Sequence, residues 1–423
     1  MNILLLCDHF PPAFAPRMGY LCKYLRTSGH EVDVVFEQLP GDKRSAYLCG
    51  YASSEHGLCF YKENNTGWKI KLQWITVMLR DVLWHYKDIQ VCKTVSHWIN
   101  QSGKTYDVIL ACSYRTFPLW AASRLARRLC LPLVVDLRDI IEQYPDRSYL
   151  NHHLLKGRIG EYLEIWQTRH LLRQRNRVLR QADAVISVSP WHVDYLKRFN
   201  PSIHLIYNGY DPEIFYPNPV RDPFFRVTYT GRIISFKIRN PEILFRAVSC
   251  LKSKKIVSEK DFRLCWYVDK ESRQMIQELA QKERIEDLME IHDFIPAAEV
   301  PSLLNRSSVL LQIANIADEK GPKGIMSTKV FEAMAIGKPM LLVPDDCSFL
   351  GRLVESSGMG MAAKTEDEVF AFLEAEYGKW KQTGSTQREV NREIVGRFSR
   401  KEQALSFLRI FEQVVESRRM TRK

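Results

Sequence analysis

Short apolar runs alternate with helical patterns along almost the whole of this 423-residue chain. Such runs indicate parallel strands that helices cover on both faces of a sheet. One series comprises residues 2–8, 31–37, 107–113, 131–137, 184–189 and 204–208, and a second comprises residues 226–231, 262–269, 289–295, 309–314 and 339–344. The sequence therefore predicts an α/β protein with two doubly wound parallel sheets.

The segment between the two series, residues 208–223, is dense in Pro, Asn, Asp and Gly, which is typical of an interdomain linker. We expect two Rossmann-like domains, one over residues 1–216 and one over residues 217–399. The basic, amphipathic segment within residues 400–423 is expected to pack back on the first domain. Because such sheets bind ligands beyond the carboxyl ends of their strands, the active site is expected in a cleft between two facing domains.

Composition narrows the class of protein. Ten cysteines are scattered without any C-x-x-C pair, which indicates reduced thiols and a cytoplasmic location. The net charge of +12 favours an anionic partner, which could be a phosphorylated substrate, an acidic membrane surface or nucleic acid. Nucleic acid ranks last among these partners, because no nucleic-acid-binding motif surrounds the arginines. No G-x-G-x-x-G motif follows the first strand, which disfavours a nicotinamide cofactor. The sequence also contains no set of residues with the spacing of metal ligands, so we expect neither a cofactor nor a metal.

Residues 327–339, STKVFEAMAIGKP, combine a helix start, a carboxylate one turn further in and a glycine stop. Ser327 or Thr328 can cap this helix, whose N–H groups and positive dipole end attract a phosphate. Glu332 lies on the same face as Thr328, where it can accept hydrogen bonds from a pair of sugar hydroxyls. The pattern predicts a nucleotide site, with a capped core helix as the alternative.

A second candidate site follows the strand at residues 226–230. This strand ends at Gly231 and is followed by Arg232 and Lys237 in the loop before a helix. Two cations at the carboxyl end of a strand can clamp a diphosphate and neutralise its charge as it leaves. The alternative is a pair of solvated surface charges.

Five segments together resemble the family-four glycosyltransferases, which are retaining enzymes of GT-B fold: VVDLRD at 134–139, ADAVISVS at 182–189, HLIYNGYDPEIF at 204–215, YTGR…K at 229–237 and STKVFEAMAIGKPM at 327–340. The resemblance implies that Arg232 and Lys237 act as catalytic groups on the donor phosphates. The other donor-binding residues that it implies are Gly231, Ser327, Thr328, Lys329 and Glu332. A UDP-sugar or GDP-sugar would bind the C-terminal domain, and a glycan or lipid-linked acceptor the N-terminal domain.

The resemblance also implies a place in cell-surface polysaccharide biosynthesis, with transfer of the hexosyl type. Without a metal or an evident nucleophile, retention requires the leaving diphosphate itself to receive the acceptor's proton on the same face of the sugar. Such a mechanism depends on positioning and electrostatics more than on a catalytic base.

Two departures from the family pattern matter. The first glutamate of the family's E-x7-E motif is replaced by Gly324, for which Glu319 or Lys323 could substitute. The N-terminal loop has only Gly19 where many relatives carry paired glycines near the donor phosphates, and Arg17 could compensate with its charge. These departures leave the donor sugar open and suggest a non-catalytic assembly subunit as one alternative. A nucleotide-sugar epimerase of the same fold is the other alternative.

Residues at two strand ends of the N-terminal half are candidates for the acceptor side. Asp136, Arg138 and Asp139 resemble the family's D-x-R-D-like element, although a buried structural ion pair is the favoured interpretation. Another strand is followed by three further candidates for the acceptor pocket: Ser113, Tyr114 and Arg115.

Two helical segments could use the basic charge at a membrane. The helix predicted over residues 68–86 has an apolar stripe along one face, with tryptophans beside the stripe. The helix predicted over residues 156–180 carries a series of arginines. Both could hold the protein at the inner face of the cytoplasmic membrane, with ordinary amphipathic helices packed on their own sheet as the alternative.

Overall fold

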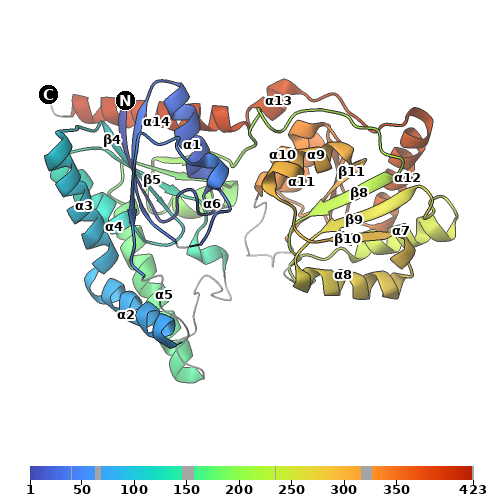
Figure 1. The fold of residues 1–423 in the computed structure, drawn as a ribbon, viewed down its shortest axis with the longest axis horizontal. Helices are drawn as coiled ribbons and strands as arrows, with labels where there is room; N and C mark the ends of the chain where they lie inside the picture. Colours follow the sequence, from blue (N-terminus) through green and yellow to red (C-terminus); the bar gives the residue numbers. More distant parts are fainter. Residues whose placement is uncertain (40, 62–67, 145–156, 234, 316–325, 422–423) are drawn as a thin grey trace. The chain divides into compact units, whose positions relative to one another are not determined.

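The computed structural model describes residues 1–421 except 40, 62–67, 145–156, 234 and 316–325 (Figure 1). The chain divides into a first unit, Met1–Tyr207 with Arg400–Lys423, and a second unit, Asn208–Ser399. The division falls after Tyr207 rather than after residue 216, because the chain beyond it joins the second unit at once. The backbone N–H of Tyr210 donates to the carbonyl of Phe398 at 3.1 Å.

The first unit is built on a seven-stranded parallel sheet with the strand order β3-β2-β1-β4-β5-β6-β7. Its strands are β1 Asn2–Cys7, β2 Glu31–Glu37, β3 Ser54–Leu58, β4 Val108–Ser113, β5 Leu133–Leu137, β6 Ala184–Ser187 and β7 Ile203–Leu205. Its helices are α1 Pro16–Thr27, η1 Ala46–Leu48, α2 Trp68–Trp84, α3 Tyr86–Ser102, α4 Leu119–Leu129, η2 Ile141–Gln143, α5 Arg158–Leu179, α6 Pro190–Leu196 and α14 Arg400–Met420.

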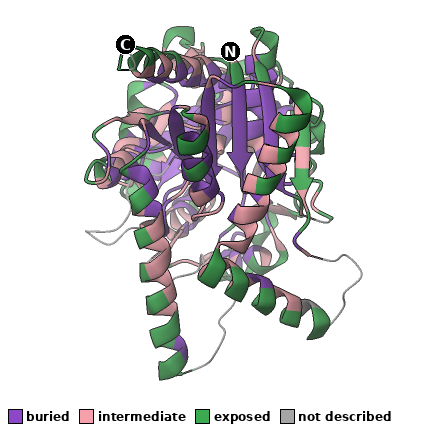
Figure 2. Ribbon diagram, turned by 90° about the vertical axis from the view of Figure 1, so that its left-hand side faces the viewer, coloured by how far each residue is buried: buried purple, intermediate pink, exposed green. Residues whose placement is uncertain are grey.

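Helices cover both faces of this sheet, whose central strands are buried (Figure 2). On one face α1 and α14 form a core that includes Phe407 and Phe411, and on the other α3, α4 and α5 form a core that includes Val91, Leu125 and Leu179. Helix α14 therefore completes the first unit although it comes from the other end of the chain.

The second unit has a six-stranded parallel sheet with the order β10-β9-β8-β11-β12-β13. Its strands are β8 Phe225–Thr230, β9 Phe262–Tyr267, β10 Met289–His292, β11 Val309–Ile313, β12 Met340–Val343 and β13 Gly360–Ala362. Its helices are α7 Glu242–Ser253, α8 Lys270–Glu283, η3 Glu286–Leu288, η4 Ala297–Glu299, α9 Val300–Arg306, α10 Thr328–Ile336, α11 Phe349–Ser356, α12 Glu366–Thr383 and α13 Arg392–Gly396. Its core gathers around the buried rings of Phe225, Phe245 and Trp266.

Side-chain caps fix several helix starts. Ser189 accepts a hydrogen bond from the N–H of His192 at the start of α6, and Asp269 accepts one from Ser272 at the start of α8. Thr365 and Glu368 form a reciprocal capping box at the start of α12. Each cap satisfies an N–H group that has no partner within its helix.

The prediction of two doubly wound parallel sheets is confirmed, and every predicted strand has a counterpart. Two strands, β3 and β13, were missed. Both lie at a sheet edge, where one neighbour suffices and an apolar run is not required. The sequence of β3, SEHGL, alternates between half-buried and exposed positions, and β13 has only three residues.

The predicted helix over residues 68–86 is interrupted. Helix α2 ends at Trp84, and His85 adopts a left-handed conformation with φ of 51° before α3 begins at Tyr86. Across the described residues, no helix combines the length and the apolar character needed to cross a bilayer.

Candidate active site

The candidate site of the second unit lies at the carboxyl ends of β8 and β11. These neighbouring strands are where the strand order reverses, since the chain passes from β8 to β9 on one side and from β11 to β12 on the other. Parallel α/β sheets bind ligands at such a switch point. Helix α10, which contains the predicted nucleotide motif, begins at Thr328 between β11 and β12.

Lys329 of α10 reaches back to the end of β8. Its Nζ lies 5.7 Å from the ring centre of Tyr229, and a β-carbon on Gly231 would collide with it. Gly231 has a φ of 145°, a conformation that residues with side chains rarely adopt. Glycine is therefore needed at this position for two reasons: it adopts the positive φ of the turn, and it leaves space for the side chain of Lys329.

The ammonium group of Lys329 is held in an unfavourable environment. Burial and, to a smaller extent, the positive charge of Arg239 lower its pKa to about 8, although the carboxylate of Glu332 opposes this effect. Glu332 is half-buried and lies three residues further along the same helix. A half-buried cation beside a second cation forms a favourable site for an anion.

Arg239 belongs to this site and was missed by sequence reasoning. Its Nη1 donates to the carbonyl of Arg232 at 2.7 Å, and its Nε donates to Oδ1 of Asn315 at 2.8 Å. Asn315 follows β11, so Arg239 links the loops after both strands. The loop after β8 carries three basic residues, and the sequence contains no signal that tells which of them turns inward.

The diphosphate clamp predicted from Arg232 and Lys237 is not preformed. Nε of Arg232 lies 2.7 Å from Oδ2 of Asp269, the residue that caps α8, and the arginine side chain is 66% exposed. Lys237 is exposed in the turn that follows. The structure thus brings Gly231, Lys329 and Glu332 together, and leaves Arg232 and Lys237 at the surface of the same loop.

Helix α10 begins where the sequence predicted, but without the expected side-chain cap. Ser327 is its N-cap residue with extended backbone, and its side chain makes no capping hydrogen bond. Thr328 is half-buried in the first turn. The preceding loop, with Glu319, Lys323 and Gly324, lies outside the described residues.

Two of the predicted residues in the first unit form a buried ion pair. Nε and Nη2 of Arg17 each lie 2.9 Å from a carboxylate oxygen of Asp136, and both side chains are buried. Arg17 also donates to the carbonyls of Ile206 and Tyr207, at 3.1 Å each. The guanidinium that we expected near the donor phosphates instead links α1, β5 and the chain after β7.

Arg138 forms a second ion pair. Its Nη2 lies 2.7 and 3.0 Å from Oδ1 and Oδ2 of Asp8, and Oδ2 also accepts a hydrogen bond from the N–H of Tyr114. Burial alone would raise the pKa of Asp8, but the charge of Arg138 lowers it to about 2. The interpretation of Asp136 and Arg138 as structural ion-pair residues is consistent with these contacts, although both partners lie outside the D-x-R-D element.

Three other predicted residues serve the local packing. A β-carbon on Gly19 would lie 2.9 Å from Leu48 and from Pro11, so this glycine permits α1 to pack closely against η1 rather than exposing its backbone to a ligand. Ser113 is buried and donates to the carbonyl of Phe117 at 2.8 Å. The guanidinium of Arg115 lies 5.4 Å from the ring centre of Tyr114.

Asp139 belongs to a chain of hydrogen bonds that sequence reasoning missed. Oδ1 of Asp139 accepts from Nε2 of Gln143 at 2.8 Å, and Oε1 of Gln143 lies 2.8 Å from Nε2 of His192. Burial raises the pKa of Asp139 and lowers that of His192 to about 4. His192 is therefore neutral at physiological pH. No sequence pattern pairs these residues, because the contact joins η2 to α6.

Over the described part of the chain, no group of three or more His, Cys, Asp and Glu side chains is arranged to hold a metal ion.

Two family models match the chain in succession. Glycosyltransferase Family 4 matches residues 17–214, and Glycosyl transferases group 1 matches residues 225–375. The chain is a family-four-like glycosyltransferase. The first match covers most of the first unit and the second falls within the second unit, so the resemblance inferred from five short segments is confirmed. A search of curated proteins by sequence found no match.

The glycosyltransferase is also similar in structure to solved proteins over almost its whole length. Sucrose-phosphate synthase from Thermosynechococcus elongatus has a TM-score of 0.60 at 15% identity, with 99% of this chain and 100% of that chain covered. A glycosyltransferase from Rickettsia africae has a TM-score of 0.63 at 13% identity, with 98% of each chain covered. HepE of Anabaena, solved with UDP and glucose, has a TM-score of 0.61 at 15% identity, with 98% and 100% covered. These similarities support the GT-B fold.

Proposed function

We propose that this glycosyltransferase moves a hexosyl group from a nucleotide-sugar to a glycan or lipid-linked acceptor with retention of configuration, in cell-surface polysaccharide biosynthesis. The observation that carries the donor assignment is the position of Lys329. The half-buried Lys329 beside Arg239, at the start of α10 and at the switch point of the second sheet, provides the positive charge that a diphosphate requires.

The donor is proposed to bind with its diphosphate at Lys329, Arg239 and the first N–H groups of α10. Glu332, one turn further, is proposed to accept hydrogen bonds from the ribose hydroxyls. HepE of Anabaena was solved with UDP and with UDP-glucose, which supports a nucleotide-sugar and favours UDP as the nucleotide. Arg232 and Lys237 remain our candidates for catalytic contacts, because a diphosphate bound at Lys329 would attract both exposed cations of the neighbouring loop.

The chemistry that these groups can supply is electrostatic. As the sugar leaves, negative charge grows on the diphosphate, and fixed cations stabilise that charge more than the charge of the bound donor. We propose that the leaving diphosphate takes the acceptor's proton, and that no cofactor or metal takes part.

The acceptor is proposed to bind the first unit beyond the carboxyl ends of β4 and β5. Tyr114, Arg115 and Asp139 are half-buried there, whereas Ser113 and Asp136 are buried and have structural partners. We therefore assign the acceptor contacts to the first three residues. A lipid-linked acceptor would require the enzyme to work from the cytoplasm at the inner face of the membrane.

Calorimetric titration with UDP, GDP and ADP tests the donor assignment, and incubation of the UDP-sugars with candidate acceptors tests the transfer. We expect UDP to bind most tightly and the product to have the anomeric configuration of the donor, as read by NMR. Release of free UDP without an acceptor would instead indicate the epimerase. No binding of any nucleotide, with recovery of a partner transferase, would indicate a non-catalytic subunit.

A further inference from the structure

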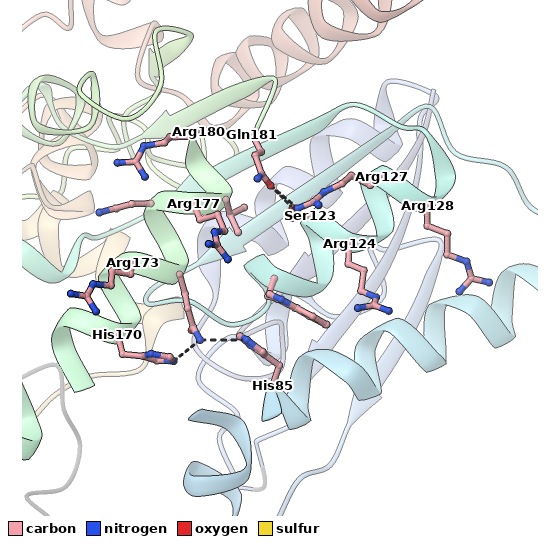
Figure 3. A pocket seen from close by; sticks show the side chains of 14 residues that line it. His85, Ser123, Arg124, Arg127, Arg128, His170, Arg173, Arg177, Arg180 and Gln181 are labelled. Atoms are coloured by element: carbon pink, nitrogen blue, oxygen red, sulfur yellow. Dashed lines mark hydrogen bonds between the residues drawn. The ribbon is translucent and has the colours of Figure 1, made fainter. Parts of the chain in front are cut away.

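A wide basic groove lies in the first unit between α4 and α5, with a volume of about 1210 Å³ (Figure 3). Six arginines line it, three from α4, two from α5 and one directly after α5: Arg124, Arg127, Arg128, Arg173, Arg177 and Arg180. His85, from the turn between α2 and α3, and His170 of α5 complete the basic lining. The groove is separate from the residues assigned above to donor and acceptor.

The positive charge of this groove is not neutralised by acidic side chains among its described lining residues. Its described lining contains no carboxylate, and none of the ion pairs in the described part of the chain involves these six arginines. Neutral partners hold some of them in place: Arg127 donates to Oε1 of Gln181 at 2.7 Å, and Arg128 to Oγ of Ser96 at 2.8 Å. Positive charges gathered in this way repel each other and attract an anion.

One face of α5 joins the groove to an apolar surface. Residues on this face recur every three or four positions. Near the start of the helix they are apolar and exposed, with Ile159 71% and Trp166 52% exposed, and towards its end they are His170, Arg173 and Arg177 of the groove. The rings of Trp166 and His170 stack at 5.5 Å, so the apolar and basic parts are continuous. Figure 2 shows this first half of α5 extending away from the sheet.

Helix α2 has an apolar stripe of the same kind. Its buried side includes Val77, and the exposed apolar side chains on another face are Trp68, Leu72, Ile75, Leu79 and Leu83. The helix ends at Trp84, directly before His85 in the lining of the groove. The ring of His85 stacks on Trp120 of α4 at 4.7 Å. Exposed apolar side chains on two helices thus adjoin one basic groove.

We propose that this surface, made of the groove, the stripe of α2 and the first half of α5, docks on a bilayer that contains anionic phospholipids. Head-group phosphates occupy the arginine groove, while the aliphatic and indole side chains enter the boundary between head groups and acyl chains. A membrane fits better than nucleic acid, because nucleic acid would use the arginines and leave the leucines of α2 in water. The inference is independent of the sugar-transfer reaction and of the donor site.

Co-sedimentation of the full chain with vesicles, in the absence of donor, tests the proposal. We expect binding to vesicles of phosphatidylglycerol and phosphatidylethanolamine, and little binding to phosphatidylcholine vesicles. The triple variant Arg124→Gln, Arg173→Gln, Arg177→Gln should weaken binding about fivefold per arginine, or about 100-fold in all. These three arginines are exposed, so the fold should persist. The matched control is the triple variant Arg221→Gln, Arg392→Gln, Arg397→Gln, at three exposed arginines of the second unit.

A second variant separates the apolar contribution from the charge. Leu72→Ser with Leu79→Ser should weaken vesicle binding, whereas Val220→Ser with Phe294→Ser, at similarly exposed positions of the second unit, should leave it unchanged. Equal binding to neutral vesicles, or an arginine variant that binds as tightly as the control, would overturn the proposal. A third outcome would also overturn the proposal: the protein does not bind vesicles but does bind inorganic pyrophosphate or single-stranded RNA. In that case the arginine variant would weaken the binding and the leucine variant would leave it unchanged.

Discussion

Lys329 of α10 occupies the space beside Gly231 that any larger residue at position 231 would fill. Two segments almost a hundred positions apart in the sequence thus depend on each other: the glycine that ends β8 makes room for the lysine, and the lysine brings its charge to the switch point of the sheet. The family resemblance names both residues as donor-binding, and the structure shows the packing that joins them.

Replacement of Gly231 by alanine should therefore damage the donor site directly. The new β-carbon would displace Lys329, and the φ of 145° would add strain of about 1–3 kcal/mol to the folded state. We expect a lower melting temperature and at least a tenfold weaker UDP affinity by calorimetry. The control is Gly378→Ala in α12, where a β-carbon meets nothing within 4 Å. Wild-type affinity in Gly231→Ala would refute the proposed role of Lys329.

The pH dependence of UDP binding should follow the charge of Lys329. Its pKa of about 8 means that the free enzyme carries the charge below pH 8 and loses it above, so the dissociation constant should rise by up to about tenfold per pH unit beyond that point. Because the pKa in the folded protein lies below the value of 10.5 for the unfolded chain, the stability of the nucleotide-free protein should rise between pH 8 and 10.5.

The variant Lys329→Met should bind UDP weakly and without this pH dependence. The matched control is Lys338→Met, since burial also lowers the pKa of that lysine just after the same helix. If Lys338→Met abolished the pH dependence and Lys329→Met retained it, the assignment of the phosphate contact would be wrong.

Glu332→Ala should raise the KM for the nucleotide-sugar more than it lowers kcat. A carboxylate that accepts hydrogen bonds from ribose acts on bound donor and transition state alike, and its loss costs about 1.5–3 kcal/mol, or roughly 10- to 100-fold in affinity. Steady-state kinetics at varied donor concentration measures this split. Glu271→Ala, at an exposed position of α8, serves as the control. Unchanged kinetics in Glu332→Ala would exclude the ribose contact.

The two aspartates of the D-x-R-D element should behave differently on substitution. Asp136→Asn breaks a buried ion pair and leaves the Arg17 charge without compensation, which should cost about 3–5 kcal/mol in urea unfolding. Asp139→Asn keeps an oxygen that can accept from Gln143, so its stability should stay within about 1 kcal/mol while acceptor turnover falls. The opposite pattern would assign the acceptor contact to Asp136.

His192 should make the protein sensitive to acid. The unfolded chain takes up a proton near pH 6.5 and the folded protein only near pH 4, so the folded state loses stability as pH falls through this window. The full effect corresponds to about 3 kcal/mol. The difference in unfolding free energy between pH 7 and 4 should shrink in His192→Gln and persist in His97→Gln, an exposed control. An equal slope in all three proteins would show that other groups cause the acid sensitivity.

The architecture could be predicted from the sequence because buried parallel strands consist of continuous apolar residues. The edge strands β3 and β13 were not predicted, because an edge strand does not require such an apolar run. The sequence also predicted the helix that carries the proposed nucleotide motif, α10. It could not tell Arg239 from Arg232 and Lys237, since three cations in one loop differ only in the direction of their side chains. Nor could the sequence show that Arg17 forms an ion pair with Asp136, because Asp136 lies on a strand that is distant in the sequence.

The first unit takes strands from the beginning of the chain and α14 from its end, so its core is assembled from both ends of the polypeptide. During synthesis at about 5–20 residues per second, the ribosome needs on the order of ten seconds or more to produce the intervening residues Asn208–Ser399. Until Phe407 and Phe411 emerge, the apolar surface of α1 and of the first sheet that α14 covers stays exposed in the nascent protein. Chaperones should therefore associate with the nascent chain over this interval, and premature termination before Arg400 should yield an aggregating product.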